Sequence, residues 1–321
     1  MNKLSYCLIG DNRGKSVVNA EKGSLQLSGL YLWSRAFNQY GKCGTIEPYW
    51  RGEDLEEFDI VHVNYTPSNN QLPTIIKDEL GTSSSTKLVV NVDLDIHYWG
   101  ANWAYYLTNF IRDVKMADVL FHVEPHGAEL IEHLIENKVN VNPHPVDVTN
   151  MYDYMNEENR EPIIGTIFHR YFPNTVIPYA AQMNIPLRRV LFGFQPTGKN
   201  GIVANAGMFD QIIKYQHFND YVKELAKCQM GCDLYEGYSY GRATIEFAGL
   251  GVPAVVSNTI GASNLFPQTS VDPYDVKGAQ KLFKKLINDV EFCNEVIIEA
   301  HEGCKMYSLE NSYKRFLEML E

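Results

Sequence analysis

Residues 233–258, DLYEGYSYGRATIEFAGLGVPAVVSN, constrain the fold more than any other stretch of this chain. A Gly-rich loop ending at Gly241 runs into an apolar helical segment with one acid, Glu246, and a Gly-x-Pro turn at 251–253 leads into the apolar run 254–257. Glycines let the backbone approach a ligand closely, and the free N–H groups at a helix start attract anions. The pattern therefore predicts a loop–helix–strand unit that holds phosphate, with Glu246 placed to accept hydrogen bonds from hydroxyls beside it.

This fragment resembles the donor site of GT-B glycosyltransferases, in particular the retaining enzymes designated family 4. The matching residues are Gly241, 245–248 and 251–257. The resemblance implies an α/β fold in which two Rossmann-like domains face an interdomain cleft and a C-terminal helix returns to the first domain. It also implies a nucleotide diphosphate sugar as donor substrate, a hydroxyl acceptor that is a carbohydrate, lipid-linked or of another kind, and no cofactor or dedicated metal.

Length, charge and cysteine content indicate the number of domains, the kinds of partner and the compartment to expect. The 321 residues, 45% hydrophobic and 21% charged, suffice for two globular domains. A net charge of −11 argues against tight, sequence-blind binding of nucleic acid, although it leaves room for a local basic cleft. The six cysteines form no C-x-x-C pair, which favours reduced, buried thiols. The N-terminus carries no signal-length apolar run, so we expect a cytoplasmic protein, with peripheral membrane contact open because many sugar acceptors are lipids.

Short apolar runs alternate with helical patterns along the chain, which predicts βαβ units on parallel sheets. The predicted strands are 5–9, 60–65, 87–92, 119–123, 162–168, 189–194, 212–218 and 254–257. The predicted helices are 25–40, 103–115, 127–137, 176–183, 221–228, 276–288 and 312–320, besides the one that follows Gly241.

The segment 139–147, VNVNPHPVD, contains two prolines that forbid a helix and stiffen the chain. It resembles the passage at which GT-B chains cross to their second domain. We therefore expect an acceptor-side domain over 1–150, a donor domain over 151–303 and a C-terminal helix over 304–321 that crosses back.

In the family, the glutamate that matches Glu246 binds the ribose hydroxyls of the nucleotide. The helix start favours the negative diphosphate, and a nearby arginine adds charge-assisted hydrogen bonds. A basic pair in the loop after strand 162–168 is expected to neutralise the leaving diphosphate. The donor-binding residues predicted in this half are Glu246, Gly241, Arg242, Tyr240, Arg170 and His169.

The family usually carries a second glutamate, eight residues before the first, that contacts the transferred sugar. Tyr238 occupies that position here, and Glu236 is the nearest acid. We expect Glu236 to take the catalytic sugar contact. The departure leaves open a GT-B-shaped binding subunit without turnover.

The first half carries a loop, IGDNRG at 9–14, which resembles the glycine loop that approaches the donor phosphates from the N-terminal domain. Gly10 and Asn12 are the predicted donor contacts in it. The loop lacks the pattern G-x-G-x-x-G, so a dinucleotide-binding dehydrogenase is unsupported.

The acceptor side is predicted at the end of strand 87–92, where Asp93 and Asp95 are followed by His97. We expect Asp95 and His97 to be catalytic. A GT-A-like transferase that holds a divalent cation on Asp93 and Asp95 is an alternative, because carboxylates suit hard cations.

A further strand end carries Glu124, where family members often have a serine N-cap, and glutamate is a poorer cap. This favours a catalytic cleft role for Glu124. A phage-type transferase acting on modified DNA bases remains a third alternative.

Overall fold

The computed structural model describes residues 3–9, 29–47, 55–66, 69–93, 107–155, 159–168, 176–194, 207–214 and 218–321. The chain divides into two compact units. The first unit comprises Met1–Asp147 and Tyr307–Glu321, and the second comprises Val148–Met306. The boundaries expected after residues 150 and 303 differ from these by three residues each.

The first unit contains a six-stranded parallel sheet of order β2-β1-β3-β4-β5-β6. Its strands are β1 (Ser5–Ile9), β2 (Cys43–Glu47), β3 (Ile60–Tyr65), β4 (Lys87–Val92), β5 (Val119–His122) and β6 (Asn140–Val141). Its helices are α1 (Leu32–Tyr40), α2 (Leu72–Leu80), a helix over 107–114, α4 (Pro125–Ile135) and α11 (Leu309–Leu320).

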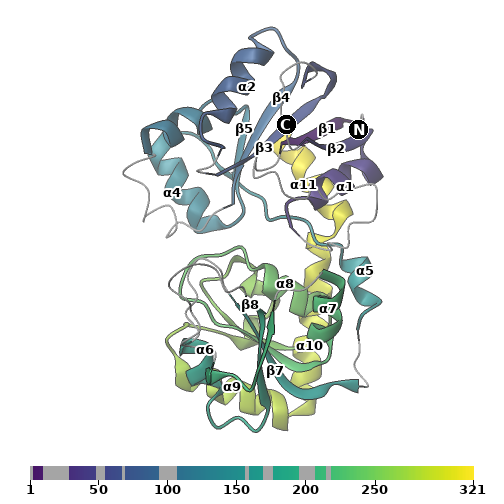
Figure 1. The fold of residues 1–321 in the computed structure, drawn as a ribbon, viewed down its shortest axis with the longest axis vertical. Helices are drawn as coiled ribbons and strands as arrows, with labels where there is room; N and C mark the ends of the chain where they lie inside the picture. Colours follow the sequence, from purple (N-terminus) through teal and green to yellow (C-terminus); the bar gives the residue numbers. More distant parts are fainter. Residues whose placement is uncertain are drawn as a thin grey trace. The chain divides into compact units, whose positions relative to one another are not determined.

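Alternating side chains of these strands build two cores, one on each face of the sheet. Cys7 and Ile9 of β1 pack with α2 and α4. Tyr6 and Leu8 of the same strand pack with α1 and α11 on the opposite face. Figure 1 shows α11 beside α1, so the end of the chain completes the core of the first unit.

The second unit contains a second six-stranded parallel sheet, of order β12-β11-β10-β7-β8-β9. Its strands are β7 (Glu161–Ile167), β8 (Arg188–Phe194), β9 (Gln211–Lys214), β10 (Cys228–Asp233), β11 (Ala254–Ser257) and β12 (Ser270–Val271). Its helices are α5 (Val148–Tyr152), α6 (Val176–Gln182), α7 (Phe218–Ala226), α8 (Arg242–Gly249), α9 (Val276–Asn288) and α10 (Val290–Cys304). The predicted α/β class with two parallel sheets is confirmed.

Most element predictions match, and the differences have local causes. The strand expected over 212–218 ends at Lys214, and Phe218 already begins α7. Cys228, expected to end a helix, begins β10. Helix α10 and strands β2 and β10 were not predicted, because their sequences show no clear period. Of the helices that the structure describes, none combines the length and apolar composition that crossing a bilayer requires.

Candidate functional site

The second sheet has a topological switch point between β7 and β10. From β7 the chain adds β8 and β9 on one side, and then β10, β11 and β12 on the other. The strands that follow β7 and β10 in the sequence therefore lie on opposite sides of this pair, and open parallel sheets bind ligands in the crevice at this position. The loop of residues 234–241 starts from the end of β10.

This loop is held in place by the turn that follows β11. The Tyr235 N–H donates to Ser257 Oγ at 2.6 Å, and Thr259 Oγ1 donates to the Tyr235 carbonyl at 2.7 Å. The Gly261 N–H donates to the Ser239 carbonyl at 2.7 Å. The path from the switch point to α8 is therefore fixed by main-chain and hydroxyl contacts.

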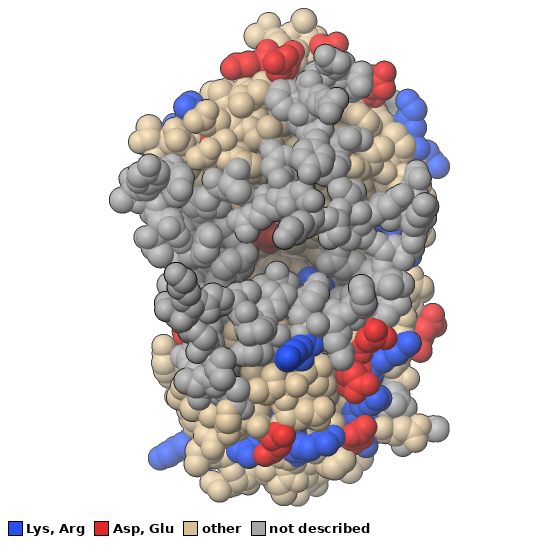
Figure 2. All heavy atoms as spheres, in the orientation of Figure 1, with Lys and Arg blue, Asp and Glu red and all other residues tan. Residues whose placement is uncertain are grey.

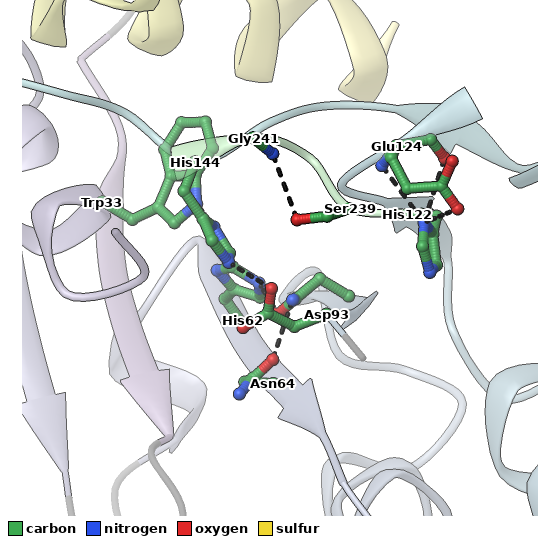
Figure 3. A network of polar contacts seen from close by, with 10 residues as sticks. Trp33, His62, Asn64, Asp93, His122, Glu124, His144, Ser239 and Gly241 are labelled. Atoms are coloured by element: carbon green, nitrogen blue, oxygen red, sulfur yellow. Dashed lines mark hydrogen bonds and ion pairs between the residues drawn. The ribbon is translucent and has the colours of Figure 1, made fainter. Parts of the chain in front are cut away.

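Gly241 occupies the N-cap of α8, in the left-handed region with φ 88°. A Cβ at this position would lie 2.3 Å from Ile260 Cγ2 and 2.9 Å from Ala262 Cβ, so both conformation and space require glycine. The Gly241 N–H lies 3.3 Å from Ser239 Oγ (Figure 3). Gly241 has no side chain to cap the helix, whose positive end meets the loop from the switch point.

The C-terminal end of α8 follows the predicted Gly-x-Pro turn. Gly251 has φ 65°, and the Val252 N–H donates to the Phe247 carbonyl at 2.9 Å, which closes the helix. A Cβ on Gly231 of β10 would lie 2.7 Å from the Phe247 ring, so glycine lets α8 pack directly on the strand.

Glu246 is 2% exposed, and its carboxylate accepts hydrogen bonds from side chains of α7 and α8. Tyr221 Oη of α7 donates to Oε2 at 2.8 Å, and Arg242 Nε donates to Oε1 at 2.8 Å. Burial, together with the carboxylate of Glu246, raises the pKa of Tyr221, so the phenol stays protonated and donates. The predicted ribose ligand is thus an oriented carboxylate inside the unit, with the guanidinium of Arg242 nearer the surface.

A second buried carboxylate lies at the end of β10. Asp233 is 1% exposed and accepts a hydrogen bond from Thr244 Oγ1 of α8 at 2.7 Å. This contact ties the first turn of the helix to the strand from which the loop departs.

The loop also carries two further predicted residues, Glu236 and Tyr240. Glu236, Tyr238 and Tyr240 are half-buried residues between β10 and α8. His169 and Arg170 follow β7 but lie outside the described residues, as do Gly10, Asn12, Asp95 and His97.

In the first unit, Glu124 is the N-cap of α4. Its carboxylate accepts hydrogen bonds from the N–H groups of Gly127 and His126, the latter at 2.8 Å, and the residue is 1% exposed. The premise that glutamate would cap this helix poorly is wrong, because its longer side chain folds back onto the first turn. The buried imidazole of His122 lies 3.5 Å from the same carboxylate (Figure 3).

Asp93 directly follows β4, and its carboxylate contacts a buried histidine. Asp93 Oδ1 lies 3.1 Å from His144 Nε2, and Trp33 Nε1 donates to His144 Nδ1 at 3.1 Å (Figure 3). Sequence reasoning missed Trp33 and His144, and in the second unit it missed Tyr221, Asp233 and Thr244. The only local signal was the place of His144 between the two prolines of the segment 139–147.

A further set of buried side chains, linked by hydrogen bonds, runs across strands β1, β3 and β4. Tyr6 Oη lies 2.5 Å from His62 Nδ1, and His62 Nε2 lies 2.8 Å from Asn91 Oδ1. Asn91 Nδ2 donates to Asn64 Oδ1 at 2.8 Å. Burial lowers the pKa of His62 to about 3, against the opposing hydrogen bond to Asn91, so this imidazole is neutral at pH 7.

Comparisons with solved structures define the fold class as GT-B. An α-glucosyltransferase in complex with UDP and a 13-mer DNA containing an HMU base superposes with a TM-score of 0.69 at 11% identity, over 99% of this chain and 100% of the other. HepE of Anabaena in complex with UDP-glucose gives 0.69 at 14% identity, over 98% and 99%. Sucrose-phosphate synthase of Thermosynechococcus elongatus gives 0.68 at 14% identity, over 99% and 98%.

No protein-family model matches this sequence, and no curated protein sequence matches it. At these identities the solved structures establish the architecture alone.

Proposed function

We propose that this protein is a glycosyltransferase that moves a sugar from a nucleotide diphosphate sugar to a hydroxyl acceptor. The observation that carries the proposal is the start of α8: Gly241 opens the helix at the end of a loop that leaves the switch point of a parallel sheet. A helix N-terminus in that position is suited to an anionic group. The oriented Glu246 carboxylate lies one turn further along the same helix.

The second unit is proposed to bind the donor. The diphosphate contacts the N–H groups at the start of α8 and the guanidinium of Arg242, while Glu246 accepts hydrogen bonds from the ribose hydroxyls. Glu246 is buried beneath Arg242, so ribose binding requires the guanidinium to turn outward toward the phosphates. The remaining donor residues proposed from the family resemblance are Tyr240, Glu236, His169, Arg170, Gly10 and Asn12.

Catalysis in this proposal consists of positioning and charge stabilisation. The bond from the anomeric carbon to the diphosphate oxygen breaks, and its electron pair leaves with the nucleotide. The helix start and basic side chains stabilise this developing charge, while the acceptor hydroxyl attacks the oxocarbenium-like carbon and its proton passes to an oxygen of the leaving diphosphate. Following the family 4 resemblance, we propose retention of configuration without a metal, with the acceptor held at the carboxyl end of β4, where Asp95 and His97 follow.

A thermal-shift panel of UDP, GDP, ADP, dTDP and CMP with their sugars tests the proposal. A ligand that binds only the folded state raises the melting temperature by an amount set by its concentration relative to its dissociation constant. At least one nucleotide should stabilise the protein, and Glu246→Ala should abolish that shift. The exposed Glu302→Gln variant, which weakens a surface contact to Lys305, is the control and should keep the shift. If no nucleotide shifts the wild type, the proposal is wrong.

A measurement of turnover distinguishes an enzyme from a binding subunit. Release of free sugar from the stabilising nucleotide sugar, measured above a protein-free background, supports transfer chemistry. Binding without hydrolysis or transfer would favour the non-catalytic alternative, for which Tyr238 at the usual glutamate position is the argument.

A DNA acceptor is a second candidate, favoured by the similarity of the whole chain to a transferase solved with DNA. On the described surface visible in Figure 2, basic and acidic side chains intermingle instead of forming one broad basic area. Transfer of radiolabelled glucose from UDP-glucose to HMU-containing DNA, compared with unmodified DNA, decides between this acceptor and others. The GT-A-like alternative loses support because the architecture is two parallel sheets.

A further inference from the structure

We propose that Trp33 and His144 are positioning residues that hold the Asp93 carboxylate at the end of β4, where it receives the hydroxyl of the acceptor. This inference rests on the proposed transferase function and adds to it the device that orients the acceptor side. It concerns residues that the family resemblance did not single out.

The geometry determines the tautomer of His144. An indole N–H can only donate, so His144 Nδ1, 3.1 Å from Trp33 Nε1, must accept. In the neutral ring the proton is therefore on Nε2, which lies 3.1 Å from Asp93 Oδ1. Trp33 thus places the ring proton on the nitrogen nearest the carboxylate, in a close N···O contact that does not meet hydrogen-bond geometry in this structure. Figure 3 shows the three side chains in this order.

Trp33 and His144 are buried, whereas Asp93 is partly exposed. Trp33 is 0% exposed and packs edge-on against Phe121 and Phe316, with ring centroids 6.3 and 5.0 Å apart. The side chain of His144 is 2% exposed, whereas that of Asp93 is 29% exposed. The histidine supports the carboxylate from inside, and the carboxylate faces outward at the strand end.

The backbone on both sides of His144 is also fixed. The Asn142 N–H donates to the His122 carbonyl at 2.9 Å, and the Val146 N–H donates to the Tyr307 carbonyl at 2.7 Å. Asp147 pairs with Arg35 of α1 at 2.7 Å. The segment that carries the imidazole is therefore held on both sides, and Trp33 contacts the ring itself.

The position of Asp93 at the end of a strand indicates what its carboxylate can bind. The carboxyl ends of parallel strands are where α/β sheets bind ligands, and a carboxylate there accepts hydrogen bonds from hydroxyls. His144 differs from the buried His62, whose ring nitrogens face Tyr6 and Asn91 inside the core, because its Nε2 lies beside a partly exposed carboxylate.

Two variants of His144 test the role. Glutamine keeps an acceptor for Trp33 and an N–H donor for Asp93, whereas methionine fills similar space with neither. With UDP-glucose hydrolysis as the probe reaction, His144→Met should lower kcat by about 10- to 100-fold, because a misplaced group near the reaction centre has this scale of effect. KM for UDP-glucose should stay unchanged, and His144→Gln should recover most of kcat. The exposed His133→Gln variant is the control.

A second measurement does not depend on turnover. Long-range ¹H–¹⁵N spectra of the ligand-free protein distinguish the two imidazole tautomers. They should show His144 protonated on Nε2 in the wild type, and a mixture of tautomers in Trp33→Phe, which removes the donor but keeps an aromatic ring. A wild-type proton on Nδ1, or equal kcat for the Met and Gln variants, overturns the positioning role. If no nucleotide sugar binds, the proposed function is overturned instead. The tautomer of His144, measured in the ligand-free protein, does not depend on that outcome.

Discussion

Arg242 Nε donates a hydrogen bond to Glu246 Oε1 at 2.8 Å across one turn of α8, with the Glu246 side chain buried and the Arg242 side chain one-third exposed. The i, i+4 spacing brings the two side chains together on one face of the helix. The pair therefore links the stability of the second unit to its proposed donor site. Because the carboxylate is buried, we expect loss of this pair to lower the free energy of unfolding more than loss of a surface pair of the same spacing would.

Replacing Arg242 with methionine should lower the free energy of unfolding by about 1–3 kcal/mol, because the buried carboxylate loses a charged donor. Urea denaturation measures the loss. Lys314→Met is the matched control, since Lys314 pairs with Glu310 at the same spacing but in a half-exposed position. Such surface pairs contribute at most about 1 kcal/mol. Equal losses in the two variants would contradict the distinct character of the Arg242–Glu246 pair.

Gly241→Ala should destabilise the second unit and weaken nucleotide binding. The left-handed conformation costs an alanine about 1–2 kcal/mol. Overlap with Ile260 and Ala262 adds about 1–3 kcal/mol. Urea denaturation measures the combined loss. A loss no larger than the conformational cost of about 1–2 kcal/mol would show that α8 can shift to make room for the methyl group.

Glu124→Ala should lower the free energy of unfolding by about 1–2 kcal/mol through loss of the N-cap of α4. Glu124→Ser should restore most of this stability, because serine is a preferred cap. Activity per folded molecule should be retained in the serine variant. A stable but inactive Glu124→Ser protein would instead support the catalytic role expected from the sequence.

Acid should destabilise the first unit through His62. Burial lowers the pKa of His62 to about 3, whereas an unfolded histidine titrates near 6.5. Below pH 6.5 the unfolded chain binds a proton that the folded chain does not. The contribution of neutral His62 to the free energy of unfolding is therefore complete above pH 6.5 and is lost as the pH falls toward 3. Between pH 7 and 5 the loss amounts to about 2 kcal/mol.

His62→Gln, which retains a donor for Asn91 and an acceptor for Tyr6, provides the comparison. Guanidinium denaturation at pH 7 and pH 5 should show a smaller acid loss in this variant than in the wild type. The same pH dependence in both proteins would show that His62 does not remain neutral when the protein folds.

Local patterns in the sequence predicted most of the strands and helices. Strands β1, β3 and β4 begin and end where their apolar runs do. The helix over Val276–Asn288 was predicted with its observed bounds, because its apolar residues recur at helical spacing between two capping aspartates. Helix α10 was missed, since buried Phe292, Val296 and Ala300 alternate with acids and exposed apolar residues that blur the pattern.

The sequence by itself determined the α8 unit, because a Gly start, an apolar helix and a Gly-x-Pro exit are local in the chain and act through backbone conformation. Only the tertiary structure decided what each carboxylate contacts. Tyr221 and Glu246 are 25 positions apart, and Trp33 and His144 are 111 positions apart. Such partners meet because strand order and core packing bring distant segments together, and no short-range pattern records that order.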